Sequence, residues 1–245
     1  MRCPQCGHEQ ASGDECEQCG IIFSKWKPHE AAEPLGSSSP LEDIFRDANV
    51  LRLNENPRGT LSMLTGWPVA REFDVVDAIG RERATVAQSR MWFSIEFAVF
   101  SSPSQQQAMN LQRPFFAFLS EMIVSGAHGE RIGSAKRRFS MLRRSYDLRD
   151  VSGLTFATIA SPVMHPWTFP IFDRSGQQRA EIAKKWAGMS EEMITGAQRF
   201  QIDFMNHDWP VAQRAVILAT ALSIDFDSFE TRRNNPSLLG VITES

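Results

Sequence analysis

All four cysteines of this 245-residue chain lie within its first 19 residues, in two Cys-x-x-Cys pairs that are each followed by glycine. The pairs are Cys3 with Cys6 and Cys16 with Cys19. Four thiolates presented by two such tight turns complete a tetrahedral structural zinc site, which leaves no open position for chemistry. Two reduced, idle pairs or a redox dithiol are the alternatives, but a redox motif uses one pair within an α/β unit. The spacing therefore predicts a zinc ribbon over residues 1–26, with zinc as a structural cofactor.

The segment after the predicted ribbon, residues 27–40, is rich in Pro, Ser, Ala and Glu, which is typical of a flexible linker. A ribbon on such a linker can recognise a protein partner independently of the rest of the chain. The remaining residues contain no cysteine, which suits a reducing compartment. The chain also does not open with a charged and then apolar leader. We therefore expect a cytoplasmic protein.

The chain beyond the cysteines contains no set of residues typical of an enzyme. It has no Gly-x-Ser-x-Gly nucleophile turn and no phosphate loop, and its five histidines are scattered. We therefore expect no enzymatic activity.

Basic residues gather between Arg131 and Arg149, where Asp147 is the only acid. Clustered Lys and Arg attract anionic lipid head groups by about 1 kcal/mol per residue near a membrane surface. Outward-facing strand residues that simply contact water are the alternative interpretation. Nucleic acid competes as a partner because its phosphates bind the same side chains, but a net charge of −3 gives no overall attraction to it. The residues that we predict to contact lipid are Lys136, Arg137, Arg138, Arg143, Arg144, Lys184 and Lys185.

Three segments repeat one pattern, an Asp-x-x-Gly turn with alternating apolar and polar residues on both sides. The turns are 77–80, 150–153 and 173–176. Aspartate at the start of a turn binds the turn's own N–H groups, and glycine supplies the positive φ that closes a hairpin. Three carboxylates at identical hairpin positions favour this structural role over catalysis. The repeat predicts a sheet built of antiparallel hairpins.

The stretch 208–230 has apolar residues on all sides of a helix, which is typical of a helix buried in protein or in a membrane. Its charge-free part, 215–224, would be about 15 Å long, about half the thickness of a bilayer core. Hairpins followed by such a helix predict a mostly β fold, a closed antiparallel barrel over 41–233 that encloses the helix, with a tail over 234–245. Asp225 lies near the helix C-terminus, where negative charge is disfavoured, so we expect the barrel wall to supply a buried donor to it.

Five short segments support this architecture by their order and spacing. They are Leu64–Trp67, Gly129–Gly133, Lys185–Gly188, Arg199–Phe204 and Ala215–Glu230. Together they resemble the phospholipid scramblase family over about residues 41–230. The resemblance implies a tubby-like barrel with a central C-terminal helix, contact with phospholipid membranes and phospholipid scrambling.

One segment departs from that family. The stretch aligned with the family's proposed calcium-binding segment, 195–200, contains no carboxylate. Because Ca²⁺ needs several oxygen ligands on one loop, calcium regulation is in doubt here. We expect a cytoplasmic protein, peripheral on the inner face of the plasma membrane, that binds anionic phospholipid. The alternative is an interaction or nucleic-acid-binding adaptor whose zinc ribbon recognises the partner and whose barrel is a scaffold.

Overall fold

A computed structural model of the chain divides it into two compact units, Met1–Ser38 and Ser39–Ser245. The residues that the structure describes are 10, 11, 13, 14, 39–56, 69–90, 93–114, 121–138, 145–161, 167–185, 199–205 and 208–234. The predicted zinc ribbon with its four cysteines, nearly all of the predicted linker and residues 235–245 lie outside these ranges.

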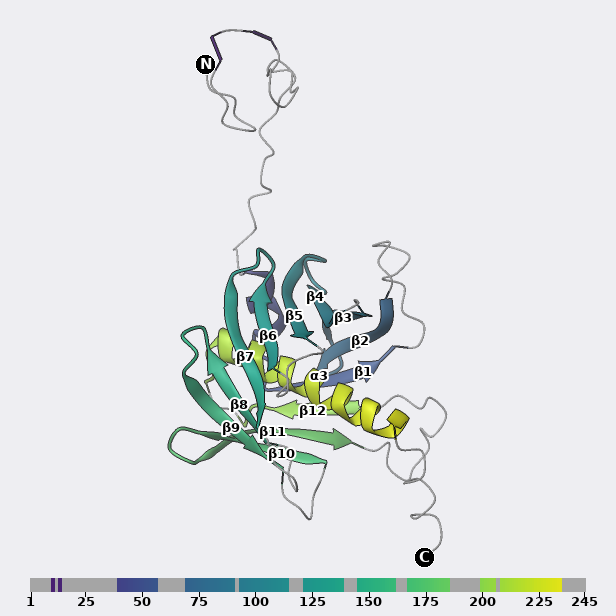
Figure 1. The fold of residues 1–245 in the computed structure, drawn as a ribbon, viewed down its shortest axis with the longest axis vertical. Coiled ribbons are helices and arrows are strands. Elements are labelled where there is room, and N and C mark those ends of the chain that lie inside the picture. Colours follow the sequence, from purple (N-terminus) through teal and green to yellow (C-terminus); the bar gives the residue numbers. More distant parts are fainter. Residues whose placement is uncertain are drawn as a thin grey trace, which may run out of the picture. The chain divides into compact units, whose positions relative to one another are not determined.

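The second unit is a closed barrel in which every strand pairs antiparallel with both neighbours, as Figure 1 shows. Going round the barrel, the order is β1-β12-β11-β10-β9-β8-β7-β6-β5-β4-β3-β2, and β2 pairs again with β1. The predicted mostly β, closed antiparallel fold is therefore confirmed. The strands are β1 Val50–Glu55, β2 Val69–Asp77, β3 Glu82–Arg90, β4 Ser94–Ser101, β5 Gln107–Pro114, β6 Glu121–Gly126, β7 Arg131–Arg138, β8 Ser145–Asp150, β9 Thr155–Ala160, β10 Thr168–Asp173, β11 Gln178–Lys185 and β12 Arg199–Asp203.

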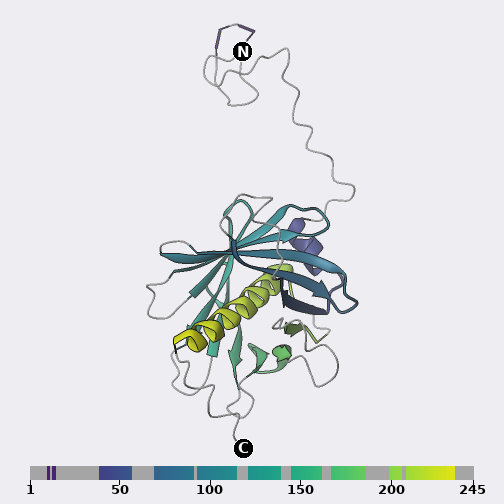
Figure 2. The same cartoon turned by 90° about the vertical axis from the view of Figure 1, so that its right-hand side faces the viewer.

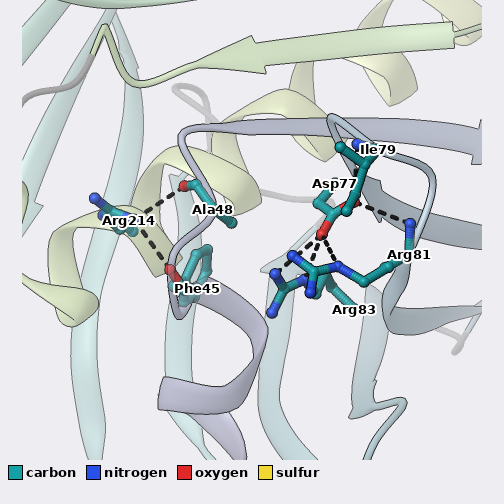
Figure 3. Close-up of polar contacts among 7 residues, drawn as sticks. All are labelled: Phe45, Ala48, Asp77, Ile79, Arg81, Arg83 and Arg214. Atoms are coloured by element: carbon teal, nitrogen blue, oxygen red, sulfur yellow. Dashed lines mark hydrogen bonds and ion pairs between the residues drawn. The ribbon is translucent and has the colours of Figure 1, made fainter.

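Because neighbouring strands are antiparallel, alternate turns lie at the same end of the barrel. One end holds the turns β2–β3, β4–β5, β6–β7, β8–β9 and β10–β11. We call this end the turn end. The three Asp-x-x-Gly turns lie there and have the predicted chemistry. Asp77 Oδ1 accepts the backbone N–H groups of Ile79 at 3.1 Å and Arg81 at 2.9 Å, and Gly80 has φ +84° (Figure 3). Asp150 and Asp173 make the same pair of bonds in their own turns.

The described residues of the barrel unit also form helices α1 (Pro40–Phe45) and α3 (Val211–Asn234). Ser39 and Glu42 form a reciprocal capping box at the start of α1. Arg214 of α3 donates to the carbonyl oxygens of Phe45 and Ala48 at 3.1 and 3.0 Å, which joins the end of α1 to the first turn of α3 (Figure 3).

Helix α3 runs through the barrel, and the strands surround it (Figures 1 and 2). Every residue from Ala215 to Asp227 is buried, so the predicted enclosure of the helix is confirmed. The helix packs closely on β7 at Gly133, where an added Cβ would lie too near the Arg149 carbonyl oxygen and 2.8 Å from Val216 Cγ2. Among the described residues, no helix is long and apolar enough to cross a membrane.

The predicted bounds of this helix, 208–230, differ from the observed ones. It begins at Val211 and ends at Asn234. The start is displaced because Trp209 is held outside the helix, where its indole N–H donates to the Arg179 carbonyl oxygen at 3.2 Å and its ring packs on Phe156.

Candidate functional site at the end of the barrel

The barrel wall changes from apolar to charged at the end opposite the turn end. Alternate strand residues face the lumen, so β1 contributes Leu51, Leu53 and then Glu55, and β5 contributes Met109, Leu111 and then Arg113. In each strand the last inward position carries the charge. We call the set Glu55, Arg71, Arg113, Arg137, Tyr146, Asp225 and Asp227 the ion cluster, and this end of the barrel the cluster end.

The first half of the ion cluster is centred on Arg71 at the start of β2. Its guanidinium binds both carboxylate oxygens of Glu55, at 2.8 and 2.9 Å. Its Nη1 forms an ion pair with Asp225 Oδ2 at 2.9 Å. Asp225 is 3% exposed, so the barrel wall supplies a buried cationic partner to it, and that partner is Arg71. Burial raises the pKa of Asp225, and the positive charge of Arg71 acts against that rise.

The second half of the ion cluster surrounds Asp227. Arg113 Nη2 donates to Asp227 Oδ1 at 2.6 Å, and the Tyr146 hydroxyl donates to Asp227 Oδ2 at 2.7 Å. Arg113 also donates to Ser223 Oγ on the same helix at 3.3 Å, while Arg137 Nη1 lies 3.7 Å from Asp227 Oδ2. Burial and the neighbouring negative charge of Asp227 raise the pKa of Tyr146, so its hydroxyl stays protonated and donates.

The cluster neutralises two aspartates, Asp225 and Asp227, that α3 buries inside the barrel, where an unpaired charge is costly. Their cationic partners come from β2, β5 and β7, so the pairs join the helix to separate parts of the wall. Removing one partner of a buried pair leaves an uncompensated charge and costs about 3–5 kcal/mol. The arrangement therefore fixes α3 inside the barrel. Within the described ranges, no three His, Cys, Asp or Glu side chains lie close enough together to hold a metal ion.

The residues predicted to contact lipid do not share one surface. Arg137 is directed toward Asp227 in the ion cluster. Lys184, 7% exposed, lies with its ammonium group 5.0 Å from the ring of Trp167 and 5.4 Å from that of Phe200. This placement does not suit a head-group contact, because a buried strand residue cannot reach a membrane surface without movement of its neighbours. Arg143, Arg144 and the side chain of Lys185 lie outside the described residues.

The other two predicted lipid-contact residues lie on the outer face of β7. Arg138 Nε is 3.1 Å from Asp147 Oδ1, and 58% of its side chain is exposed. Lys136 pairs in register with Asp147 of β8. The single acid noted in the basic segment thus lies among its basic residues, and it reduces the positive charge that this wall offers to a partner.

Sequence reasoning missed Arg71, Arg113 and Tyr146. Each faces inward and lies within two residues of the end of its strand. The signal was therefore a charged or hydroxylated residue at the next inward position of an alternating apolar series. That signal is readable only when the strand ends and the parity of the alternation are known.

A closed antiparallel barrel that holds its own C-terminal helix by internal ion pairs defines the class of this protein. Residues 55–231 match the family model described as Scramblase, and the chain belongs to the scramblase family. It is also similar to "Altered inheritance rate of mitochondria protein 25" of Saccharomyces cerevisiae, with 29% identity over 125 residues. That match covers 42% of this chain and 38% of the yeast protein, so it spans less than half of either. No solved structure matches the chain.

Proposed function

We propose that this protein binds phospholipid membranes peripherally, through the outside of its barrel, and that α3 stays within the barrel while it does so. The observation that carries the proposal is the match to the scramblase family over residues 55–231, combined with a lumen already filled by a helix that the ion cluster holds.

Insertion of α3 into the bilayer would be unfavourable. Withdrawing the helix would empty a core in which Ile217, Leu218 and Leu222 are each at most 1% exposed. Each large apolar side chain lost from a core costs about 2–5 kcal/mol. A whole domain is stable by only about 5–15 kcal/mol, so withdrawal of α3 amounts to unfolding the barrel.

The electrostatic part of the proposed contact rests on Lys136 and Arg138, with Arg143, Arg144 and Lys185 as further predicted contributors. At about 1 kcal/mol per basic residue near an anionic surface, these residues would give weak, salt-sensitive binding. The predicted location, cytoplasmic and peripheral on the inner face of the plasma membrane, follows from the same proposal.

Vesicle sedimentation tests membrane binding, and a lipid-flip assay tests scrambling separately. We expect the full-length protein to sediment with vesicles of phosphatidylserine and phosphatidylcholine at low salt. Failure to sediment would refute the proposed function. In the flip assay, a fluorescent lipid on the inner leaflet of protein-containing vesicles becomes accessible to dithionite only if the protein moves lipid. Sedimentation without flip would identify a binding protein that does not scramble.

The zinc ribbon over residues 1–26 is a second proposal, supported by the spacing of Cys3, Cys6, Cys16 and Cys19. In the adaptor alternative the ribbon recognises a protein or nucleic-acid partner. A pull-down with the full-length protein and a variant carrying serine at the four cysteines separates the two functions. If the variant loses a partner but still sediments with vesicles, the ribbon acts as an adaptor beside a lipid-binding barrel.

A further inference from the structure

Four large apolar side chains are exposed at the turn end of the barrel. Ile79 in the β2–β3 turn is 74% exposed, Val151 and Leu154 in the β8–β9 turn are 63% and 59% exposed, and Met205 after β12 is 44% exposed. We call these four residues the apolar rim. Among the described residues, Phe93 at the cluster end, 68% exposed, is the other exposed large hydrophobic residue.

We propose that the apolar rim enters the interfacial region of a lipid bilayer and is the membrane-docking surface of this protein. The inference rests on the proposed function, since it names the surface through which membrane binding takes place. Lys136 and Arg138 lie on the outer wall near the cluster end. Docking through the apolar rim therefore gives the electrostatic part of the contact to basic residues of the turns instead.

The spacing of the apolar rim fits lipid better than a protein partner. The strands between its members follow one another as β2, β1, β12, β11, β10, β9 and β8. Neighbouring strands lie about 4.8 Å apart. Ile79 and Met205 are separated by about two strands, or roughly 10 Å, and Met205 and Leu154 by about three strands, or roughly 15 Å. Protein hot spots are central, contiguous and fully desolvated. Separate apolar tips do not form such a patch, but each can enter a fluid interface by itself.

Basic residues accompany the tips. Arg81 belongs to the same turn as Ile79, and 63% of its side chain is exposed although its Nε is paired with Asp77 Oδ2 at 2.9 Å. Arg174, in the β10–β11 turn between the two apolar turns, is exposed and donates from Nε to the Thr155 carbonyl oxygen. An apolar tip beside an arginine is the amphipathic combination found at membrane interfaces, where the apolar group is buried and the cation stays at the head groups.

The acids at these turns are occupied within the turns. Asp77, Asp150 and Asp173 each bind two backbone N–H groups of their own turn. These bonds fix the shape of the hairpins, so the apolar tips are presented on rigid supports. A rigid support lowers the entropy cost of docking because little further ordering is needed on binding.

The test compares full-length wild type with two variants. In the rim variant Ile79, Val151, Leu154 and Met205 are all replaced by serine, and in the control Phe93→Ser removes an equally exposed apolar side chain at the cluster end. Circular dichroism and thermal melting verify that both are folded. Binding is measured by sedimentation with vesicles of phosphatidylcholine alone and with added phosphatidylserine, at about 0.1 and 1 M salt, since 1 M salt screens surface charge to about 3 Å. The oligomeric state is measured by size exclusion with light scattering.

We expect wild type to retain vesicle binding at high salt, the rim variant to bind about tenfold more weakly, and Phe93→Ser to bind like wild type. If wild type binds vesicles and the rim variant binds equally well, the docking surface lies elsewhere and the inference is overturned while the proposed function stands. Equal losses in both variants would also overturn it, because the effect would not be specific to the rim. If wild type is a dimer that the rim variant dissociates, the rim is a protein contact and the inference fails. Absence of wild-type binding to every vesicle would refute the proposed function itself.

Discussion

The Tyr146 hydroxyl at the start of β8 donates a 2.7 Å hydrogen bond to Asp227 on α3. This bond joins the wall of the barrel to the helix inside it, between residues far apart in the sequence. Arg113 binds the other carboxylate oxygen of Asp227 at 2.6 Å. The helix is therefore held at this point by two donors from different strands.

Replacing Tyr146 with Phe removes one of these donors and keeps the ring. Because the acceptor is a buried carboxylate, we expect the free energy of unfolding to fall by about 1.5–3 kcal/mol. Urea denaturation measures the change as a lower midpoint with an unchanged slope. The exposed control Arg138→Gln should stay within about 0.5 kcal/mol of wild type. An unchanged midpoint for Tyr146→Phe would show that the bond does not stabilise the fold.

Replacing Arg71 with Met should be more costly, because it removes the ion-pair partner of the buried Asp225 carboxylate. We expect a loss of about 3–5 kcal/mol. Asp225→Asn should cost less, since it removes the buried charge as well as the pair. The double variant should lose less than the sum of the two single losses, because the residues interact directly. Additive losses in this double-mutant cycle would contradict the ion pair.

Adding a methyl group at Gly133 should destabilise the contact between β7 and α3. The new Cβ would meet the Arg149 carbonyl oxygen and Val216 Cγ2 at distances that require atoms to shift. We expect Gly133→Ala to cost about 1–3 kcal/mol by overpacking, measured by thermal or urea unfolding. Combining it with Val216→Ala should recover part of that cost, because one of the two clashing atoms is then absent.

The Asp77 turn should contribute to acid stability. Burial acts to raise its pKa, but the backbone and side-chain bonds from Arg81, together with the bond from Arg83, lower the pKa of Asp77 to about 2. Because an unfolded aspartate titrates near 3.9, this contribution is complete above about pH 3.9 and is lost as the pH falls through about 2.

Thermal melting from pH 5 to pH 2 checks this sign. Asp77→Asn keeps the turn's acceptor oxygen and removes the charge. We therefore expect the melting temperature of this variant to fall less between pH 5 and pH 2 than that of wild type. Asp47→Asn is the matched control, since Asp47 is exposed and its φ of +54° is accessible to Asn. A melting temperature that falls as steeply with pH in Asp77→Asn as in wild type would contradict the prediction.

The cysteine pairs predict one tightly bound zinc ion per chain. Elemental analysis of the purified protein should find about one zinc, and Cys6→Ser should lose it, because all four thiolates are needed to complete the site. His8→Ala should keep it. Removing zinc with a chelator should leave the melting of the barrel unchanged, since residues 1–38 form a separate unit. Wild-type protein without zinc would contradict the ribbon.

The sequence by itself determined the features that depend on neighbouring residues. An aspartate and a glycine three positions later contain the acceptor and the backbone freedom that a hairpin turn needs, so the turns at Asp77, Asp150 and Asp173 were predictable. The enclosure of α3 was predictable too, because a helix with no polar side must be covered on every side. A partner for Asp225 was predicted from a helix end at residue 230, but the helix continues to Asn234, and the burial of Asp225 is what requires the partner.

Only the tertiary structure decided which residues meet. Adjacent Arg137 and Arg138 have the same chemistry, yet one is directed toward Asp227 and the other lies beside Asp147 on the outer wall. Their direction depends on strand parity, and a shift of one residue in register would exchange them. Lys184 was assigned to a membrane surface by its charge, whereas its inward position on β11 buries it between two aromatic rings. Register depends on how whole neighbouring strands pair and on where each strand begins and bulges, so it cannot be read from the type of a single residue.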